Sequence, residues 1–329
     1  MLEHGGRLRA AARQYEIPLA DWLDLSTGIN PNGYPVPPLD PACWQRLPED
    51  DDGLEAAAAA YYGNARVLAL SGSQAAIQIL PALFPPAAVA CLSPIYEEHP
   101  QAWARAGHRL RRLPSLQRAL AAATPNIMLC NPNNPTAQTL PRSALLDAAA
   151  QLQRRGGWLI VDEAFGDADP ENCVAPFAGT PDAPNLIVLR SLGKFFGLAG
   201  ARVGFIFGAS EKLDRLREAL GPWPLSGPAR AVARHALADT VWHTQARAGL
   251  AAAGPRLAAL LAPLGEVSST ALFSTVATPD VSALFEHFAH RAILIRCFDT
   301  AGLLRFGLPG NEGDWQRLAL AIKERKPAC

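Results

Sequence analysis

The sequence predicts an α/β fold, with a mostly parallel seven-stranded sheet in a large domain and a smaller α+β domain at the C-terminus. Three observations support this prediction. Short apolar runs recur between about residues 65 and 208, Gly, Pro or Asn bounds each run, and longer segments of helical composition separate them. Strands that alternate with helices are typical of a parallel sheet covered on both faces. The expected strands are Val67–Leu70, Ala88–Leu92, His108–Leu113, Asn126–Cys130, Trp158–Val161, Asn185–Leu189 and Arg202–Phe207.

The chain changes character after Gly208. We expect long helices rich in Ala, Leu and Arg over about 210–220 and 228–261, two short strands near 292–298 and 303–308, and a closing helix from Asp314. A Pro-rich stretch, 31–41, separates an N-terminal arm from the sheet-forming part. The expected domains are therefore the arm at 1–27, the large domain at 28–215 and the small domain at 216–329.

The composition suits a packed globular protein. The 329 residues are enough for about two domains at roughly 150 residues each. Hydrophobic residues make up 49% of the chain, which excludes a disordered protein. Thirty Lys plus Arg balance thirty Asp plus Glu, so no overall charge attracts nucleic acid or a membrane surface. We expect neither partner, and any anion must be bound locally.

The cysteines follow no metal or disulfide pattern. They stand at positions 43, 91, 130, 173, 297 and 329, without a C-x-x-C motif or a neighbouring pair of histidines. We expect no metal and reduced thiols, as in a cytoplasmic protein. Glu3 and Arg7 interrupt the N-terminus where an export signal needs an apolar run, and Pro255 and Arg256 interrupt the most apolar later stretch. We therefore expect a cytoplasmic location and no membrane-spanning segment.

Polar, small or aromatic residues follow five of the expected strands. In parallel sheets, ligands bind beyond the C-terminal ends of the strands, so these segments are candidate site residues. They are Ser71–Gln74, Ser93–Tyr96, Asn131–Thr136, Asp162–Phe165 and Ser191–Lys194. Nucleotide motifs are absent from them: no G-x-G-x-x-G follows the first strand, and Gly193-Lys194 lacks the upstream glycine of a P-loop.

A lysine, an acid and an arginine in these segments suit a site for pyridoxal 5'-phosphate (PLP). Lys194 stands in a glycine-containing turn, Asp162 ends a buried strand, and Arg202 follows the lysine by eight positions. In such a site a lysine forms a Schiff base, an acid keeps the pyridine nitrogen protonated, and an arginine neutralises the phosphate. Two alternatives stay open: Asp162 caps a helix, or Glu163 is the functional acid. Alternation along the strand favours Asp162.

Four motifs together resemble the fold-type I PLP-dependent enzymes of the aspartate aminotransferase superfamily. They are Ser191-x-x-Lys194, Gly200-Ala-Arg-Val-Gly204, Asp162-Glu-Ala and Asn134-Pro-Thr136. Within that superfamily, His4-Gly5-Gly6 and the segment 25–33 (LSTGINPNG) resemble the threonine-phosphate decarboxylases of cobalamin biosynthesis. The resemblance implies a PLP-dependent transferase type of fold, a homodimer, and decarboxylation of L-threonine O-3-phosphate to (R)-1-amino-2-propanol O-2-phosphate.

The resemblance also implies a role for individual residues. For the cofactor, Lys194 forms the Schiff base, Asp162 pairs with the pyridine nitrogen, Asn134 bonds the ring hydroxyl, Tyr96 stacks on the ring and His99 orients the aspartate. The cofactor phosphate is bound by Gly72, Ser73, Gln74, Ser191 and Arg202. The substrate carboxylate is bound by Arg305, while Arg296, His4 and Asn30 are the candidates for its phosphate. Without the resemblance, Tyr96 and His99 would be interpreted as structural residues. Arg296 and Arg305 would be interpreted as surface residues on strands.

Two residues depart from the pattern of the related aminotransferases. Phe165 stands where they have a tyrosine that donates to the ring hydroxyl, which is expected of the decarboxylase branch. Leu47 stands where they have a tyrosine that reaches the neighbouring subunit's cofactor phosphate. Two alternative functions remain: a histidinol-phosphate type of aminotransferase, and a catalytically silent binding module with the same fold.

Overall fold

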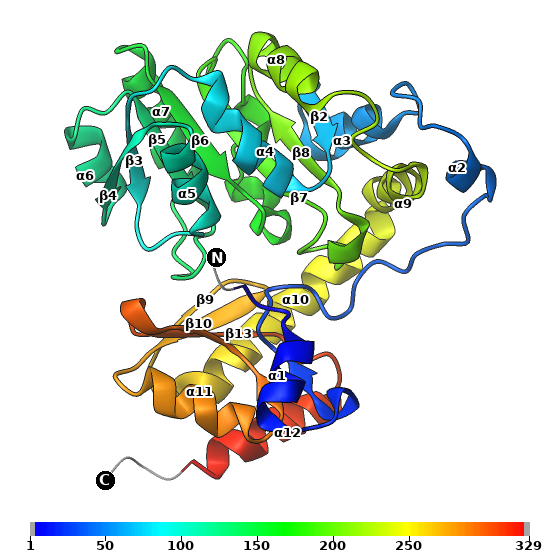
Figure 1. Cartoon of the computed structure of the whole chain (residues 1–329), viewed down its shortest axis with the longest axis vertical. Coiled ribbons are helices and arrows are strands. Elements are labelled where there is room, and N and C mark those ends of the chain that lie inside the picture. The colour runs from blue at the N-terminus through cyan, green and yellow to red at the C-terminus, as the bar shows by residue number, and fades with distance from the viewer. Residues whose placement is uncertain (1–3, 326–329) are drawn as a thin grey trace. The chain divides into compact units, whose positions relative to one another are not determined.

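The computed structural model describes residues 4–325, and the chain divides into two compact units (Figure 1). Residues 33–134 and 139–244 form what we call the sheet unit, and residues 1–32, 135–138 and 245–329 form the terminal unit. Glu3 and Cys329, used in the sequence analysis, lie outside the described residues. Within 4–325, no helix has both the length and the apolar character needed to cross a bilayer.

The sheet unit contains the predicted seven-stranded, mostly parallel sheet. Its strand order is β2-β8-β7-β6-β5-β3-β4, and β8 alone runs antiparallel to its neighbours. The strands are β2 (Val67–Leu70), β3 (Ala88–Leu92), β4 (Arg109–Leu113), β5 (Asn126–Cys130), β6 (Trp158–Asp162), β7 (Leu186–Ser191) and β8 (Gly204–Phe207). Each apolar run formed a strand because its side chains are buried within a sheet covered by helices. The edge strand β4 is the exception and exposes Arg109, Arg111 and Arg112.

Helices cover this sheet through apolar positions at helical spacing. One face is packed by α4 (Ser73–Ile79), α5 (Glu98–Arg105) and α8 (Ser210–Leu220), with Trp103 of α5 among the most buried residues. The helix α7 (Arg142–Gln153) packs on β6 and buries Leu145, Ala148, Ala149 and Leu152. The remaining helices are α2 (Ala42–Gln45), α3 (Leu54–Tyr62), α6 (Leu116–Ala121) and α9 (Gly227–Ala238).

The units differ in extent from the expected domains. The expected boundaries fell after residues 27 and 215, whereas the units divide after Asn32 and Thr244. The difference arises because α8 packs on α4, and α9 packs on α3, inside the sheet unit. The single helix expected over 228–261 is two helices, α9 and α10 (Thr240–Leu261). They separate at Asp239, whose side chain accepts a hydrogen bond from the N–H of Trp242 at 2.9 Å.

The terminal unit is built on a four-stranded antiparallel sheet with the order β12-β13-β10-β9. Its strands are β9 (Glu266–Ser269), β10 (Phe273–Ala277), β12 (Arg296–Phe298) and β13 (Leu303–Gly307). The sequence analysis expected only two strands here. It missed β9, which is mostly exposed and polar, and β10. The expected strand 292–298 is divided at Ile295, because Ile293–Leu294 (β11) pairs with β1 (Leu23–Asp24) and β12 pairs with β13.

The N-terminal arm packs within the terminal unit. Its helix α1 (Leu8–Tyr15) buries Ala11 in a small core with Trp22 and with residues near β11. The other helices of this unit are α11 (Val281–Ala289) and α12 (Glu312–Lys323). The arm is therefore held by apolar burial and by strand pairing.

A buried ion pair fixes the start of α3 in the sheet unit. Arg230 of α9 is 3% exposed and donates to Asp52 through Nε at 2.9 Å and Nη2 at 2.6 Å. Asp52 also accepts the N–H of Leu54, the first residue of α3, at 3.0 Å. Burial alone raises the pKa of Asp52, but the hydrogen bonds from Arg230 and Leu54 outweigh it, and the pKa is lowered. This interaction connects the segment before α3 with α9.

Replacing Arg230 should destabilise the protein and do so in a pH-dependent way. Arg230→Met removes the nearer of two cations from the partly buried Asp52 and leaves Arg234 at 3.9 Å, so we expect the free energy of unfolding to fall by about 1.5–3 kcal/mol at neutral pH. Because the folded pKa of Asp52 is lowered, the stabilisation is present above the ordinary aspartate pKa and is lost as the pH falls through the lowered value. Urea unfolding from pH 7 down to pH 3 measures both effects.

The matched control is Arg217→Met. Arg217 pairs with Asp214 at 2.8 Å, but both side chains are largely exposed, so the expected loss is below about 1 kcal/mol. Equal losses in the two variants, or a loss for Arg230→Met that does not shrink at low pH, would contradict the interpretation.

Candidate functional site

The C-terminal ends of the central strands bring the candidate residues of the sheet unit to one edge. Asp162 ends β6 and is paired with Cys130, the last residue of β5. Ser191 ends β7 and leads into the turn that carries Lys194. Because β5, β6 and β7 are parallel, these ends lie at the same edge of the sheet, where ligands bind in such folds.

Asp162 and His99 form a buried pair at this edge. The Nε2 atom of His99 lies 2.8 Å from Oδ2 of Asp162, and the two residues are 2% and 5% exposed. The other carboxylate oxygen of Asp162 accepts the N–H of Ala164 at 2.9 Å. His99 stands in the first turn of α5, and the carboxylate is thus held from two sides. This geometry allows a carboxylate to bond a cationic ring nitrogen in a fixed direction.

Tyr96 is fixed by a chain of hydrogen bonds through Gln74. The hydroxyl of Tyr96 donates to Oε1 of Gln74 at 3.2 Å, and Nε2 of Gln74 donates to Glu98 at 2.9 Å. Burial, with the negative charges of Glu98 and Asp162, raises the pKa of Tyr96 to about 12, so the phenol stays neutral. The side chain of Gln74 therefore orients Tyr96. The sequence analysis expected Gln74 to bind the cofactor phosphate and did not predict this contact.

Cys130 is a site residue that the sequence analysis did not find. Its Sγ and the ligand atoms of His99 and Asp162 all lie within 4.8 Å of one another. It accepts backbone N–H groups of Tyr96 and Asn134, which places both segments beside Asp162. Burial, followed by the charge of Asp162, raises the pKa of Cys130 well above its ordinary value. Cys130 therefore lies at the same buried strand edge as His99 and Asp162.

Gly72, Ser73, Ser191 and Arg202 lie close together, and we call them the candidate anion cradle. Leu70 at the end of β2 and Ser191 at the end of β7 are both paired with Gly204 of β8, so the segments that follow them are neighbours. Gly72 has φ of +76°, and a Cβ on it would lie 2.8 Å from Nη2 of Arg202. Only glycine leaves room for the guanidinium there. The cradle combines this exposed cation with the hydroxyl of Ser191, which suits a phosphate.

Lys194 lies beside the turn that follows Asp162. Its Nζ is 5.4 Å from the centre of the Phe165 ring, and Phe165 comes three residues after Asp162. Hydrogen bonds from Gly197 to Lys194 (3.1 Å) and from Tyr34 to Phe196 (2.8 Å) shape the turn. Lysine, carboxylate and phosphate cradle are therefore all present in one unit, and this donor set fits PLP.

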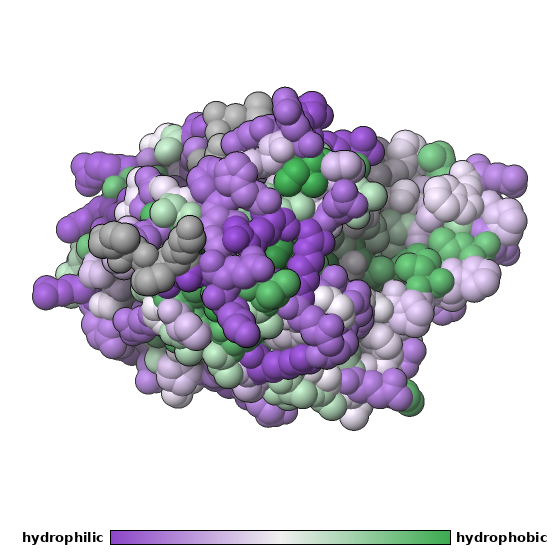
Figure 2. Space-filling model, turned by 90° about the horizontal axis from the view of Figure 1, so that it is seen from below, coloured by the Kyte–Doolittle hydropathy of each residue, from purple (hydrophilic) through white to green (hydrophobic). Residues whose placement is uncertain are grey.

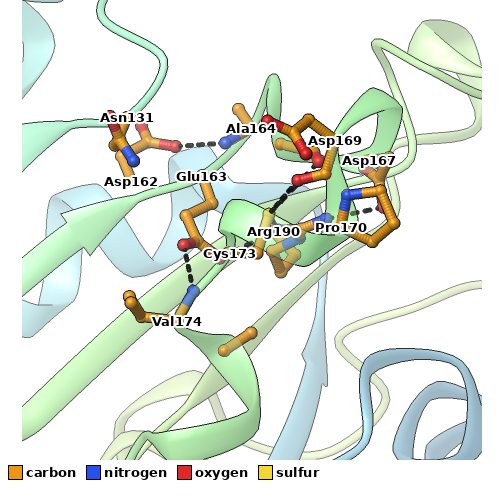
Figure 3. A network of polar contacts seen from close by, with 12 residues as sticks. Asn131, Asp162, Glu163, Ala164, Asp167, Asp169, Pro170, Cys173, Val174 and Arg190 are labelled. Carbon is orange, nitrogen blue, oxygen red and sulfur yellow. Dashed lines mark hydrogen bonds and ion pairs between the residues drawn. The ribbon is translucent and has the colours of Figure 1, made fainter. Parts of the chain in front are cut away.

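Glu163, the alternative acid, belongs to a different network. It is fully buried, accepts the N–H of Val174 at 2.6 Å and pairs with Nη1 of Arg190 at 2.8 Å. Arg190 also pairs with Asp167 at 2.8 Å. Figure 3 shows the Glu163 carboxylate directed toward Val174 and that of Asp162 toward Ala164. Burial raises the pKa of Glu163, although Arg190 opposes the shift. These contacts support Asp162 as the acid that faces a ligand.

The candidate substrate residues lie in the terminal unit. Arg296 on β12 and Arg305 on β13 are direct partners across the two antiparallel strands, so their side chains share a face. Both guanidinium groups lie near the ring of Phe298, at 5.1 Å and 5.8 Å. Arg305 is 6% exposed, and its Nη2 donates to the carbonyl of Ser26 at 2.8 Å.

The arm residues and Leu47 differ in burial. His4 is exposed, whereas Asn30 is buried and accepts the N–H of Asn32 at 3.0 Å through its side chain. Leu47 is exposed in the sheet unit. The structure therefore gathers the cofactor candidates in the sheet unit, and the substrate candidates in the terminal unit.

Comparison with known proteins is consistent with this site. Residues 47–322 match the family model for aminotransferase class I and II. A threonine-phosphate decarboxylase of Pseudomonas aeruginosa is 50% identical and covers 98% of this chain and 97% of its own. One from Sinorhizobium is 40% identical, with 97% of each chain covered. The crystal structure of histidinol-phosphate aminotransferase from Sinorhizobium meliloti in complex with pyridoxal-5'-phosphate superposes with a TM-score of 0.82 over 98% of each chain at 20% identity, which shows the shared fold.

Proposed function

Because this chain belongs to the class I and II aminotransferase family, we propose that it is a PLP-dependent lyase of cobalamin biosynthesis. It decarboxylates L-threonine O-3-phosphate to (R)-1-amino-2-propanol O-2-phosphate. Relatives that are 50% and 40% identical over nearly the full chain carry the name of this activity. Phe165 also favours the decarboxylase branch, since it offers no hydroxyl to the cofactor ring.

The observation that carries the choice of substrate is the pair Arg296 and Arg305. Like charges directly opposite each other destabilise an antiparallel pair, and a ligand with two anionic groups compensates for them. Threonine phosphate has a carboxylate and a phosphate. We assign the carboxylate to the buried Arg305, and the phosphate to Arg296 with His4 and Asn30. Histidinol phosphate has a phosphate but no carboxylate.

The candidate cofactor-binding residues would act by holding the charged groups of the cofactor, its ring nitrogen and its phosphate, in fixed positions. PLP, when bound, would accept the electron pair that CO₂ leaves at the substrate Cα. It would favour cleavage only of a bond that overlaps its π system. Asp162, held by His99, keeps the ring nitrogen protonated, while Arg202 and Ser191 bind the phosphate. Lys194 would attach the cofactor and, once freed by the substrate amine, would donate a proton to Cα in place of the lost CO₂. Arg305 sets the direction of the carboxylate and thereby favours its loss over loss of the α-proton.

The partners and location follow from the same proposal. The exposed apolar residues Val36, Trp44 and Leu47 lie on the segment around α2, and hydrophobic surface is visible in Figure 2 at the end where Figure 1 places α2. An exposed apolar segment of this kind supports a homodimer. The buried free thiols of Cys91 and Cys173 support a reducing, cytoplasmic location.

A substrate comparison tests the reaction. The PLP-loaded protein is incubated with L-threonine O-3-phosphate, and separately with histidinol phosphate and 2-oxoglutarate. We expect CO₂ release matched by aminopropanol phosphate in the first case and no glutamate in the second. Glutamate formation would favour the aminotransferase instead. A visible cofactor absorbance without turnover of either compound would favour the silent module.

The attachment of the cofactor at Lys194 can be mapped directly. Borohydride reduction followed by peptide mass mapping should place the pyridoxyl group on the peptide that contains Lys194, because this lysine lies at the strand edge beside the Asp162 turn. Lys194→Ala should keep the fold and lose turnover. Lys212→Ala is the control, since Lys212 packs over Phe84 and Trp158. A label on any other lysine contradicts the assignment.

Asp162→Asn and Glu163→Gln should separate the two neighbouring acids. Asp162→Asn removes the charge beside the ring nitrogen, so kcat should fall by orders of magnitude while PLP still binds. Glu163→Gln removes one of the two carboxylate charges that pair with Arg190, so we expect a loss of stability of about 1–3 kcal/mol with kcat largely retained. Steady-state kinetics and urea unfolding measure these effects. An active Asp162→Asn beside an inactive Glu163→Gln would assign the role to Glu163.

A further inference from the structure

Ser26, near the end of the N-terminal arm, contacts the start of that arm through its side chain and Arg305 through its backbone. We propose that Ser26 is a positioning residue which couples the docked start of the arm, residues 4–7, to the orientation of Arg305. The arm then controls affinity for the substrate carboxylate, in addition to any contact with the phosphate. This inference rests on the proposed function, in which Arg305 binds that carboxylate.

The Ser26 carbonyl that accepts from Arg305 is held in a fixed direction. The N–H and the hydroxyl of Ser26 both donate to Oδ1 of Asp24, at 2.9 Å and 2.6 Å. The hydroxyl in turn accepts the N–H of Gly6 at 2.7 Å. Ser26 is 2% exposed, and Nη2 of Arg305 reaches its carbonyl at 2.8 Å. One residue thus receives the arm on its side chain and Arg305 on its backbone.

The backbone around Ser26 is anchored on two sides within the terminal unit. The N–H of Leu25 donates to Leu294 at 2.8 Å, and the N–H of Gly307 donates to the carbonyl of Leu25 at 2.7 Å. Gly307 follows Arg305 by two residues on β13. A shift of Ser26 is therefore transmitted to the strand that carries Arg305 as well as to its guanidinium.

Gly5 packs directly against the same carbonyl. A Cβ on Gly5 would lie 2.3 Å from the Ser26 oxygen and 2.9 Å from its carbonyl carbon, closer than atoms can approach. The neighbouring Gly6 differs: its φ is +77°, and an added Cβ would meet only Thr27 at 3.6 Å. An extra methyl group at Gly5 thus displaces the arm or the Ser26 carbonyl, whereas one at Gly6 strains the arm without touching that carbonyl.

The test uses two ligands, and each carries only one of the two anionic groups of the proposed substrate. L-Threonine has the carboxylate without the phosphate, and 1-amino-2-propanol O-2-phosphate has the phosphate without the carboxylate. Dissociation constants are measured by absorbance titration of the PLP-loaded protein. For Gly5→Ala we expect affinity for L-threonine to fall about tenfold, with that for the aminopropanol phosphate within about twofold of wild type. Ser26→Ala, which removes the acceptor for Gly6, should show the same pattern.

Three further variants calibrate the result. Arg305→Ala should weaken binding of L-threonine alone, and Arg296→Ala that of the aminopropanol phosphate alone. Gly156→Ala, at a glycine of the sheet unit with φ of +70° and no atom within 4 Å of an added Cβ, should lower the thermal midpoint and leave both affinities within about twofold of wild type. Weakening of the phosphate ligand alone in Gly5→Ala and Ser26→Ala overturns the coupling, and so does equal weakening of both ligands or of neither. A wild-type protein that binds neither ligand overturns the proposed function, and the coupling with it.

Discussion

The ion pair between Arg190 and Glu163 is the interaction on which the placement of Asp162, the candidate partner of the cofactor, depends. It joins the end of β7 to the residue that follows β6, and side chains alternate along these strands. Asp162 and Ser191, one residue away from each partner, therefore lie on the ligand side. Arg190 also neutralises Asp167, so two carboxylates are buried around one guanidinium. Removing that cation would leave charges that the interior cannot solvate, and both strand ends would have to move.

The candidate residues fall into two sets, one in each unit. The sheet unit presents a carboxylate, a lysine and a phosphate cradle at one sheet edge, which are groups that a charged aromatic cofactor requires. The terminal unit presents Arg296 and Arg305 on adjacent strands, which are groups that a small dianionic substrate requires. Under the proposed function, the sheet unit therefore supplies the groups that bind the cofactor, and the terminal unit supplies the groups that bind the substrate. Strand pairing places Asp162 and Ser191 in the first set and the two arginines in the second.

The sequence predicted the seven-stranded sheet well because every strand except the edge strand β4 is an apolar run that is bounded by breakers and mostly buried. It failed at β9, since the Glu266–Ser269 segment is mostly solvent-exposed and carries no apolar signal. Local patterns also could not show that Arg296 faces Arg305, which depends on the strand register, nor that Cys130 lies beside His99. Lys194, Asp162 and Arg202 were found from the residues themselves, and the other cofactor candidates came from the family resemblance. The Arg190–Glu163 ion pair and the hydrogen bond between Tyr96 and Gln74 became visible only in the folded chain.

The arginines of β4 affect how readily the incompletely folded protein aggregates. β4 is an edge strand, and an open edge offers unpaired N–H and C=O groups to any other extended chain. Arg109, Arg111 and Arg112 place positive charge along that edge, with Arg112 bound in bidentate fashion to Glu97 at 2.7 Å and 2.6 Å. Two copies approaching edge to edge would bring these charges together and repel each other. The strand therefore guards against aggregation during folding, when its neighbours are still incompletely covered.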